Sequence, residues 1–318
     1  MSRHNLFTSN FKEIGKFIIK CFLFLGIVVA FLLYLSPQYL GNYQASLIDK
    51  VERLESIEGP KIVLIGDSNL AFGIDSEKIE ETFGMPVVNM GLHGGLGNVF
   101  HEEMAKLNVD EGDLYIVCHC RYSDDDRIEN EDLAWITIED HPRLWQILRT
   151  EDYLPMFEAY PVYLKKCIAL WLEDSGNQMD KGVYSRKAFN EYGDIEWRDR
   201  GQEYIFKDGD IFVPLISDNV CERLNELNGY LEERGATLLI AGYPITLIDS
   251  TPSADLYVEF QNELEEKLDA PVISNYTDYF FPEGYFLNTE YHLNNIGKRA
   301  RTNQLIADIE RYFEELNE

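Results

Sequence analysis

Three short polar segments carry the residue types that acyl transfer requires. The first, Ile65 to Asn69 (IGDSN), places the hydroxyl of Ser68 directly after a run of apolar residues. The second, Asn89 to Gly95, is rich in glycine, and the third, Phe286 to Lys298, contains His292. A serine nucleophile, backbone N–H donors and a histidine base are the parts of a serine esterase or acyltransferase.

Short apolar segments alternate with amphipathic ones along the chain, and this alternation would bring the three motifs together. Strands are expected at 62–65, 87–90, 113–120, 236–244 and 270–275, and helices near 76–83, 98–107, 218–234, 257–268 and 294–316. The pattern indicates an α/β fold with a doubly wound parallel sheet of about five strands. Because ligands bind beyond the carboxyl ends of such strands, we expect the serine, the glycines and the histidine at one edge.

The order IGDSN, NMGLHGG and YHLNNIG resembles the SGNH/GDSL hydrolase superfamily, closest to its membrane-anchored branch that modifies cell-surface polysaccharides and teichoic acids. The resemblance covers about 61–316, with a poorly matched middle, and implies a flavodoxin-like fold. It implies Ser68 as nucleophile, His292 as general base, and the backbone amides of Ser68 and Gly91 as oxyanion donors. The candidate substrate contacts are Asn69, Arg121 and Tyr122.

The sequence departs from the pattern of that family at two positions. The family has an asparagine donor after the third strand, where this chain has CHCRYSDD, so His119, Arg121 or Tyr122 would replace it, or the hole has two donors. The family also has an aspartate three residues before the histidine, where this chain has Thr289. Glu290, Asn288 or a backbone carbonyl could orient the imidazole instead, since the third triad member chiefly fixes tautomer and orientation.

Each motif also has a structural interpretation. Asp-Ser-Asn is good turn and N-cap chemistry, and His292 could simply precede the last helix, with Asn294 or Asn295 as its cap. His93, His101 and His119 with nearby cysteines fit no recognised metal-ligand spacing, so neither a metal nor another cofactor is expected. The aromatic residues of the poorly matched middle could bind a sugar or pack a small core of their own.

The N-terminal segment predicts a membrane anchor. Phe17 to Leu35 is a run of 19 residues interrupted only by Lys20, and at 1.5 Å per residue it would span roughly 28 Å, about the thickness of the hydrocarbon core. Basic residues precede it, so the N-terminus is expected in the cytoplasm and the remainder outside. A cleaved signal peptide is the alternative. The expected organisation is a tail at 1–16, an anchor at 17–36, a stalk or linker helix at 37–60 and an SGNH-like domain at 61–318, with an insertion at about 122–214.

Composition narrows the class of function. The formal net charge of −28 argues against a nucleic-acid partner, because phosphate binding requires a basic face. The resulting hypothesis is an esterase or O-acyltransferase acting on acyl esters of a cell-envelope glycan or a teichoic-acid-like polymer, with a membrane-bound partner as a possible acyl donor. Two alternatives stay open: a non-catalytic envelope protein that binds glycan or scaffolds polymer modification, and, with less support, a lipid esterase.

Overall fold

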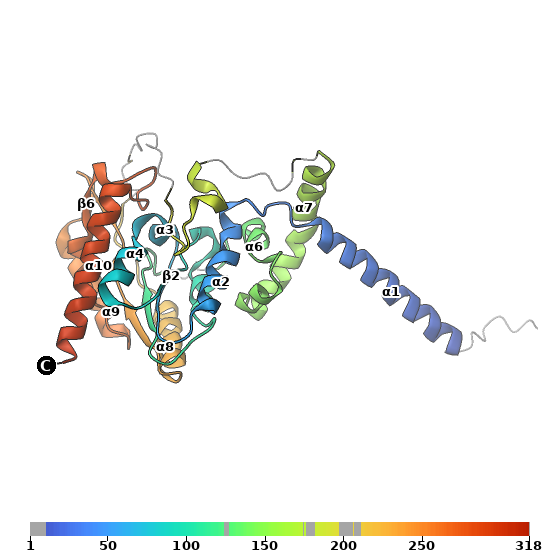
Figure 1. The fold of residues 1–318 in the computed structure, drawn as a ribbon, viewed down its shortest axis with the longest axis horizontal. Helices are drawn as coiled ribbons and strands as arrows, with labels where there is room; N and C mark the ends of the chain where they lie inside the picture. Colours follow the sequence, from blue (N-terminus) through green and yellow to red (C-terminus); the bar gives the residue numbers. More distant parts are fainter. Residues whose placement is uncertain are drawn as a thin grey trace, which may run out of the picture.

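A computed structural model describes residues 11–123, 127–173, 175, 182–196, 206 and 211–317. Most of the predicted cytoplasmic tail therefore lies outside the described residues. Helix α1, Phe11–Leu35, projects from the remainder of the molecule (Figure 1), and the part from Glu13 is long and apolar enough to cross a membrane. The helix fits a membrane anchor or a signal sequence.

The centre of the fold is a parallel sheet in the order β2-β1-β3-β4. Its strands are β1 (Ile62–Ile65), β2 (Val87–Asn89), β3 (Leu114–Val117) and β4 (Thr237–Ile240). The expected fifth strand at 270–275 is reduced to a single parallel bridge between Ile240 and Val272. Two further short strands, β5 (Ile245–Leu247) and β6 (Phe280–Pro282), form a separate parallel pair.

The central strands are apolar along their whole length because helices cover both faces of the sheet. Successive side chains of a strand point to opposite faces. Ile62 and Leu64 accordingly join a core cluster with α4 and α10, whereas Val63 and Ile65 join a larger cluster that includes α2, α5, α8 and α9. The helices are α2 (Leu47–Ser56), α3 (Ser68–Gly73), α4 (Ser76–Phe83), α5 (Asn98–Met104), α6 (Glu131–Ile138), α7 (Tyr153–Leu172), α8 (Asp218–Glu232), α9 (Ala254–Lys267) and α10 (Asn295–Glu315).

The segment predicted to be a stalk belongs to the domain. Leu47, Val51 and Leu54 of α2 are buried in the larger core cluster. Lys50 on the same helix is also buried, and its Nζ donates to the backbone oxygens of Asn89 and Gly193, each at 2.7 Å. The amphipathic helix predicted before the first strand is present as α2, but it packs against the domain. Periodicity alone does not show whether the apolar face of a helix contacts its own domain.

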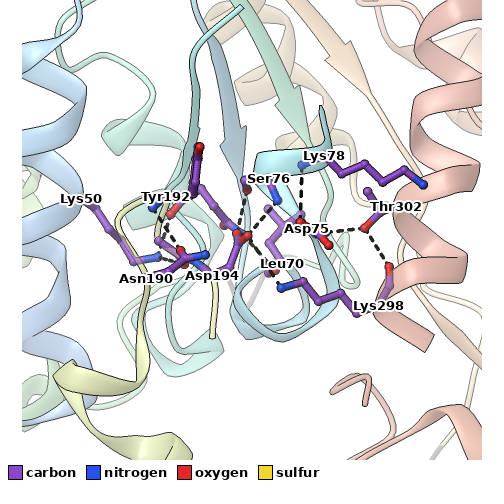
Figure 2. A network of polar contacts seen from close by, with 12 residues as sticks. Lys50, Leu70, Asp75, Ser76, Lys78, Asn190, Tyr192, Asp194, Lys298 and Thr302 are labelled. Atoms are coloured by element: carbon purple, nitrogen blue, oxygen red, sulfur yellow. Dashed lines mark hydrogen bonds and ion pairs between the residues drawn. The ribbon is translucent and has the colours of Figure 1, made fainter. Parts of the chain in front are cut away.

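The predicted insertion at about 122–214 contacts the strand ends of the sheet through its later part. Asp194, near its end, is buried and accepts hydrogen bonds from the Ser76 amide at 2.8 Å, the Ser76 hydroxyl at 2.7 Å and Asn89 Nδ2 at 2.8 Å. Figure 2 shows Asp194 in this polar network between Lys50 on one side and the start of α4 on the other. Residues 192–195 are thereby fixed against the strand ends, where the three sequence motifs meet.

Candidate functional site

Ser68 lies where β1 turns into α3. Asp67 caps this helix by accepting a hydrogen bond from the Asn69 amide at 2.7 Å, and Ser68 is the first helical residue. The turn is tight at Gly66, since a Cβ built there would lie 3.0 Å from the Cys118 carbonyl oxygen on the neighbouring strand. The turn interpretation of Asp-Ser-Asn is therefore correct, and it also leaves the Ser68 hydroxyl at the sheet edge.

His292 lies in the loop before α10, and local hydrogen bonds hold that loop. Thr289 Oγ1 accepts from the His292 amide at 3.0 Å, and Asn294 caps α10 by accepting from two of its first amides. His292 Nε2 lies 2.9 Å from Ser68 Oγ, although 224 residues separate the two in sequence. The structure thus brings together the predicted nucleophile and the predicted base.

Asn288 orients the imidazole from its other side. His292 Nδ1 lies 2.9 Å from Asn288 Oδ1, and Asn288 Nδ2 donates to the Tyr184 hydroxyl at 2.8 Å. Because the amide oxygen faces the ring, Nδ1 carries the proton and donates, so Nε2 presents its lone pair to the Ser68 hydroxyl. Of the three candidates for the orienting position, the Asn288 side chain makes this contact rather than a backbone carbonyl, and Glu290 lies in the wall of the adjacent cavity.

The environment of His292 favours the neutral ring. The imidazole is buried and stacks on Phe72, with ring centroids 4.0 Å apart and planes 8° from parallel. Burial lowers the pKa of His292 to about 4, and the negative charge of Asp67 opposes that effect. At neutral pH the ring is therefore uncharged and able to accept a proton from Ser68.

A buried polar chain supports the turn that carries Ser68. Arg301 of α10 is fully buried and donates to the Asn69 backbone oxygen at 2.6 Å and to Asn69 Oδ1 at 2.7 Å. Asn69 Nδ2 donates in turn to Asp67 Oδ1 at 2.6 Å and to the Cys118 carbonyl at 3.0 Å. Asn69 was predicted to contact substrate, but it is buried with its amide engaged, and it joins the buried Arg301 to Asp67 beneath Ser68.

Two other predicted site residues also face away from the cavity. The Gly91 amide donates to Asn89 Oδ1 at 2.9 Å, and Gly91 is not one of the described residues that line the cavity. Tyr122 is buried, and its hydroxyl lies 3.4 Å from that of Tyr276 in the core. The sequence could not show where these donors point. A residue at the end of a strand lies near the edge of the sheet, but its position in the sequence does not fix the direction of its hydrogen-bond donor.

Ser68 and His292 open into a cavity of about 290 Å³. Of the predicted contacts, Arg121 and Glu290 line it. Sequence reasoning missed Tyr43 and Asn98, which also line it: Tyr43 precedes the first strand, and Asn98 begins a helix at a position that looks like an ordinary cap. The wall further includes His93, Gly94, Gly95, Gly97, Cys120, Glu129, Tyr184, Thr289 and Tyr291.

The histidines and cysteines near the site form no metal centre in the described part of the chain, where no group of three or more His, Cys, Asp or Glu side chains is arranged to hold an ion. His119 Nε2 instead lies 3.1 Å from Glu102 Oε1, and Arg223 Nε lies 2.5 Å from the other oxygen of the same carboxylate. Cys120 donates its thiol to Asp67 Oδ2 at 2.9 Å. These hydrogen bonds give the side chains of His119 and Cys120 structural partners within the protein.

Comparison with known proteins identifies no family for this chain. No family model matches it, and its sequence matches no curated protein. The structure itself shows an α/β fold with a parallel four-stranded sheet flanked by helices, and one N-terminal apolar helix. At the carboxyl edge of the sheet, a serine, a histidine and an asparagine are joined by hydrogen bonds.

Proposed function

We propose that the protein is a membrane-anchored serine esterase or O-acyltransferase of the SGNH type, acting outside the cytoplasm on acyl esters of a cell-envelope glycan. One observation carries the proposal: the hydrogen-bonded series Ser68, His292 and Asn288 lies beside an open cavity. Nucleophile, base and orienting group stand in the order and at the separations that acyl transfer requires. The three motifs that resemble the SGNH superfamily supply these same residues.

The reaction follows from the hydrogen bonds. Ser68 Oγ attacks the ester carbonyl carbon while its proton passes to His292 Nε2, and the tetrahedral oxyanion forms. The oxyanion collapses, the bond to the sugar oxygen breaks, and His292 returns the proton to that leaving oxygen. Water or a second sugar hydroxyl, deprotonated by His292, then releases the acyl group from Ser68. Water completes an esterase reaction, and a sugar completes an O-acyltransferase reaction.

The oxyanion donors we propose are the backbone amides of Ser68 and Gly94. Ser68 supplies its own N–H from the first position of α3, as the sequence indicated. Gly94 takes the place that had been assigned to Gly91: it lines the cavity, and among the contacts of the described residues its N–H has no acceptor. A Cβ at Gly94 would lie 3.7 Å from Asp67 Oδ2, next to the turn that carries the nucleophile.

The character of the wall supports a sugar ester as substrate. Tyr43, Tyr184 and Tyr291 contribute aromatic groups to the lining, and Arg121 and Glu129 contribute polar groups, with Arg121 Nη1 lying 3.5 Å from Glu129 Oε1. Aromatic faces bordered by charged groups suit a polyol that carries a short acyl group better than a long lipid chain. No cofactor takes part in this chemistry.

The second candidate is a glycan-binding envelope protein without catalytic activity. Two observations favour it: the orienting partner of His292 is a neutral amide, and the Gly91 amide is engaged with Asn89. A binding protein would use the same cavity and the same aromatic wall. It would leave the hydrogen bond between Ser68 and His292 without a chemical role.

Covalent labelling separates the two candidates. The purified full chain, held in detergent micelles, is treated with a fluorophosphonate and assayed with p-nitrophenyl acetate, beside Ser68→Ala, His292→Ala and the exposed-serine control Ser56→Ala. An enzyme is labelled at Ser68 and loses turnover in the first two variants only. Equal labelling and turnover in all four proteins would refute the proposal. O-acetylated polysaccharide, with and without an acceptor glycan, then distinguishes hydrolysis from transfer.

A further inference from the structure

Helix α7, within the predicted insertion, exposes an unusual number of large apolar side chains. Leu154, Phe157, Trp171 and Leu172 are 67%, 57%, 52% and 71% exposed. The opposite side of the same helix packs into the core through Met156, Tyr163 and Cys167. A surface helix of a soluble domain normally turns a polar face outward. This helix is apolar on its inner side and along much of its outer side.

Apolar residues form a stripe along one side of the helix. Leu154, Phe157, Pro161 and Leu172 are exposed and Ile168 is half-buried, and they follow one another at intervals of three, four, seven and four. The exposed Trp171 lies at the edge of this stripe. Scattered exposed apolar residues are ordinary on protein surfaces, whereas a contiguous row marks a surface that meets something apolar. Charged residues of the helix lie beside the stripe, and one of them, Lys166, is paired with Asp132.

The position of α7 indicates what covers the stripe. α7 is in contact with α1, and Figure 1 shows it at the end of the domain from which α1 leaves, running across the direction of α1. The chain that links α1 to the domain packs on its inner side, where the rings of Tyr39 and Tyr163 stack with centroids 6.0 Å apart. If α1 crosses a bilayer, α7 lies at the surface of that bilayer and roughly in its plane.

We propose that α7 is an interfacial membrane helix, with Leu154, Phe157, Trp171 and Leu172 inserted at the boundary between lipid headgroups and acyl chains. Lipid fits better than another protein because α7 is in contact with α1, whose apolar side chains are themselves exposed. A tryptophan at the end of such a helix is typical of membrane interfaces. The inference rests on α1 being a membrane span and is independent of the esterase chemistry.

The consequence is a restricted orientation of the domain relative to the bilayer. Tyr43 in the cavity wall is four residues beyond Tyr39, which packs against α7. A single transmembrane helix alone would let the domain swing on its tether. A second contact along α7 would restrict that swing.

The test measures quenching of tryptophan fluorescence by brominated lipid. Helix α1 contains no tryptophan, so any quenching in the full chain reports the domain. The protein is reconstituted into phosphatidylcholine vesicles with bromine near the headgroup end of the acyl chains. We expect Trp171 emission to be blue-shifted and quenched, and Trp171→Phe to lose the quenched component. Because apolar contact drives the insertion, quenching should persist at high salt.

Two added tryptophans make the result independent of that one variant. In the Trp171→Phe background, Phe157→Trp on α7 should be quenched, whereas Phe313→Trp should not. Phe313 is 36% exposed on α10, which lies at the other end of the molecule from α1 (Figure 1). Equal quenching at 157 and 313, or none at 157, overturns the proposal. Loss of quenching at high protein density, with cross-linking through α7, would assign the stripe to a second copy. Fluorophosphonate labelling in the same vesicles reports the esterase proposal separately.

Discussion

Replacing Asn288 by aspartate should move the acid limb of the activity profile to higher pH. The limb reports protonation of His292, because only the neutral ring accepts the Ser68 proton. In the native protein the pKa of His292 is lowered to about 4, chiefly by burial against Phe72 and its neighbours. Asn288 Oδ1 lies 2.9 Å from Nδ1, so an aspartate there would place a negative charge in direct contact with the ring.

The size of the shift follows from that contact. An opposite charge within a few ångströms favours the charged form and moves a pKa by about 1–3 units, each worth about 1.36 kcal/mol. The carboxylate stabilises the imidazolium, so the pKa of His292 rises, to roughly 5–7. With a midpoint near 6, activity at pH 5 should be about tenfold below the variant's own plateau, whereas the native protein remains near its plateau there.

The assay is kcat/KM for p-nitrophenyl acetate between pH 3.5 and 8, with circular dichroism at each pH to exclude unfolding. Glu290→Gln is the matched control, because Glu290 lines the cavity two residues before His292 while Asn288 contacts the ring. An acid limb that stays in place in Asn288→Asp would refute the assigned role of Asn288. So would a limb that moves in Glu290→Gln.

Three further predictions concern residues that hold the site. Tyr184→Phe removes the acceptor of Asn288 Nδ2, and the loss of about 1 kcal/mol should lower kcat about fivefold with KM nearly unchanged. Arg301→Met leaves two buried acceptors of Asn69 without their donor and should lower the free energy of unfolding by about 2–4 kcal/mol in urea titrations. Burial lowers the pKa of Lys50 to about 7, so between pH 7 and 10.5 the unfolded chain binds the extra proton and stability should rise with pH. Lys50→Met should abolish that rise in urea titrations at several pH values.

The sheet could be predicted because its strands consist of residue types that are normally buried. β1, β3 and β4 are short runs of apolar residues between turn signals, and a strand covered on both faces requires that composition. The expected fifth strand shrank to one bridge at Val272, next to Pro271, which cannot donate a ladder hydrogen bond. The sequence correctly located the segment that pairs with Ile240, but it predicted a longer strand than the structure contains.

The pairing of Ser68 with His292 could also be predicted, because both follow from where strands end. The finer assignments could not. Whether Asn69 faces the cavity or Arg301 depends on a residue 232 positions away that no local pattern associates with the turn. The Gly91 amide is engaged through the side chain of Asn89, which the sequence gives no reason to expect. Such contacts are decided by packing between distant segments.

The neutral Asn288 and the stacking of Phe72 act on His292 in the same direction. Both favour the uncharged ring, which is the form that accepts the Ser68 proton. In the proposed reaction the cost falls in the transition state, where a buried imidazolium would form with an amide as its Nδ1 partner. Asp67, directly before the proposed nucleophile, is the group whose negative charge most favours that imidazolium. The buried chain from Arg301 through Asn69 to Asp67 therefore has two effects: it fixes the turn that carries Ser68, and it keeps a carboxylate beside the base that lacks one of its own.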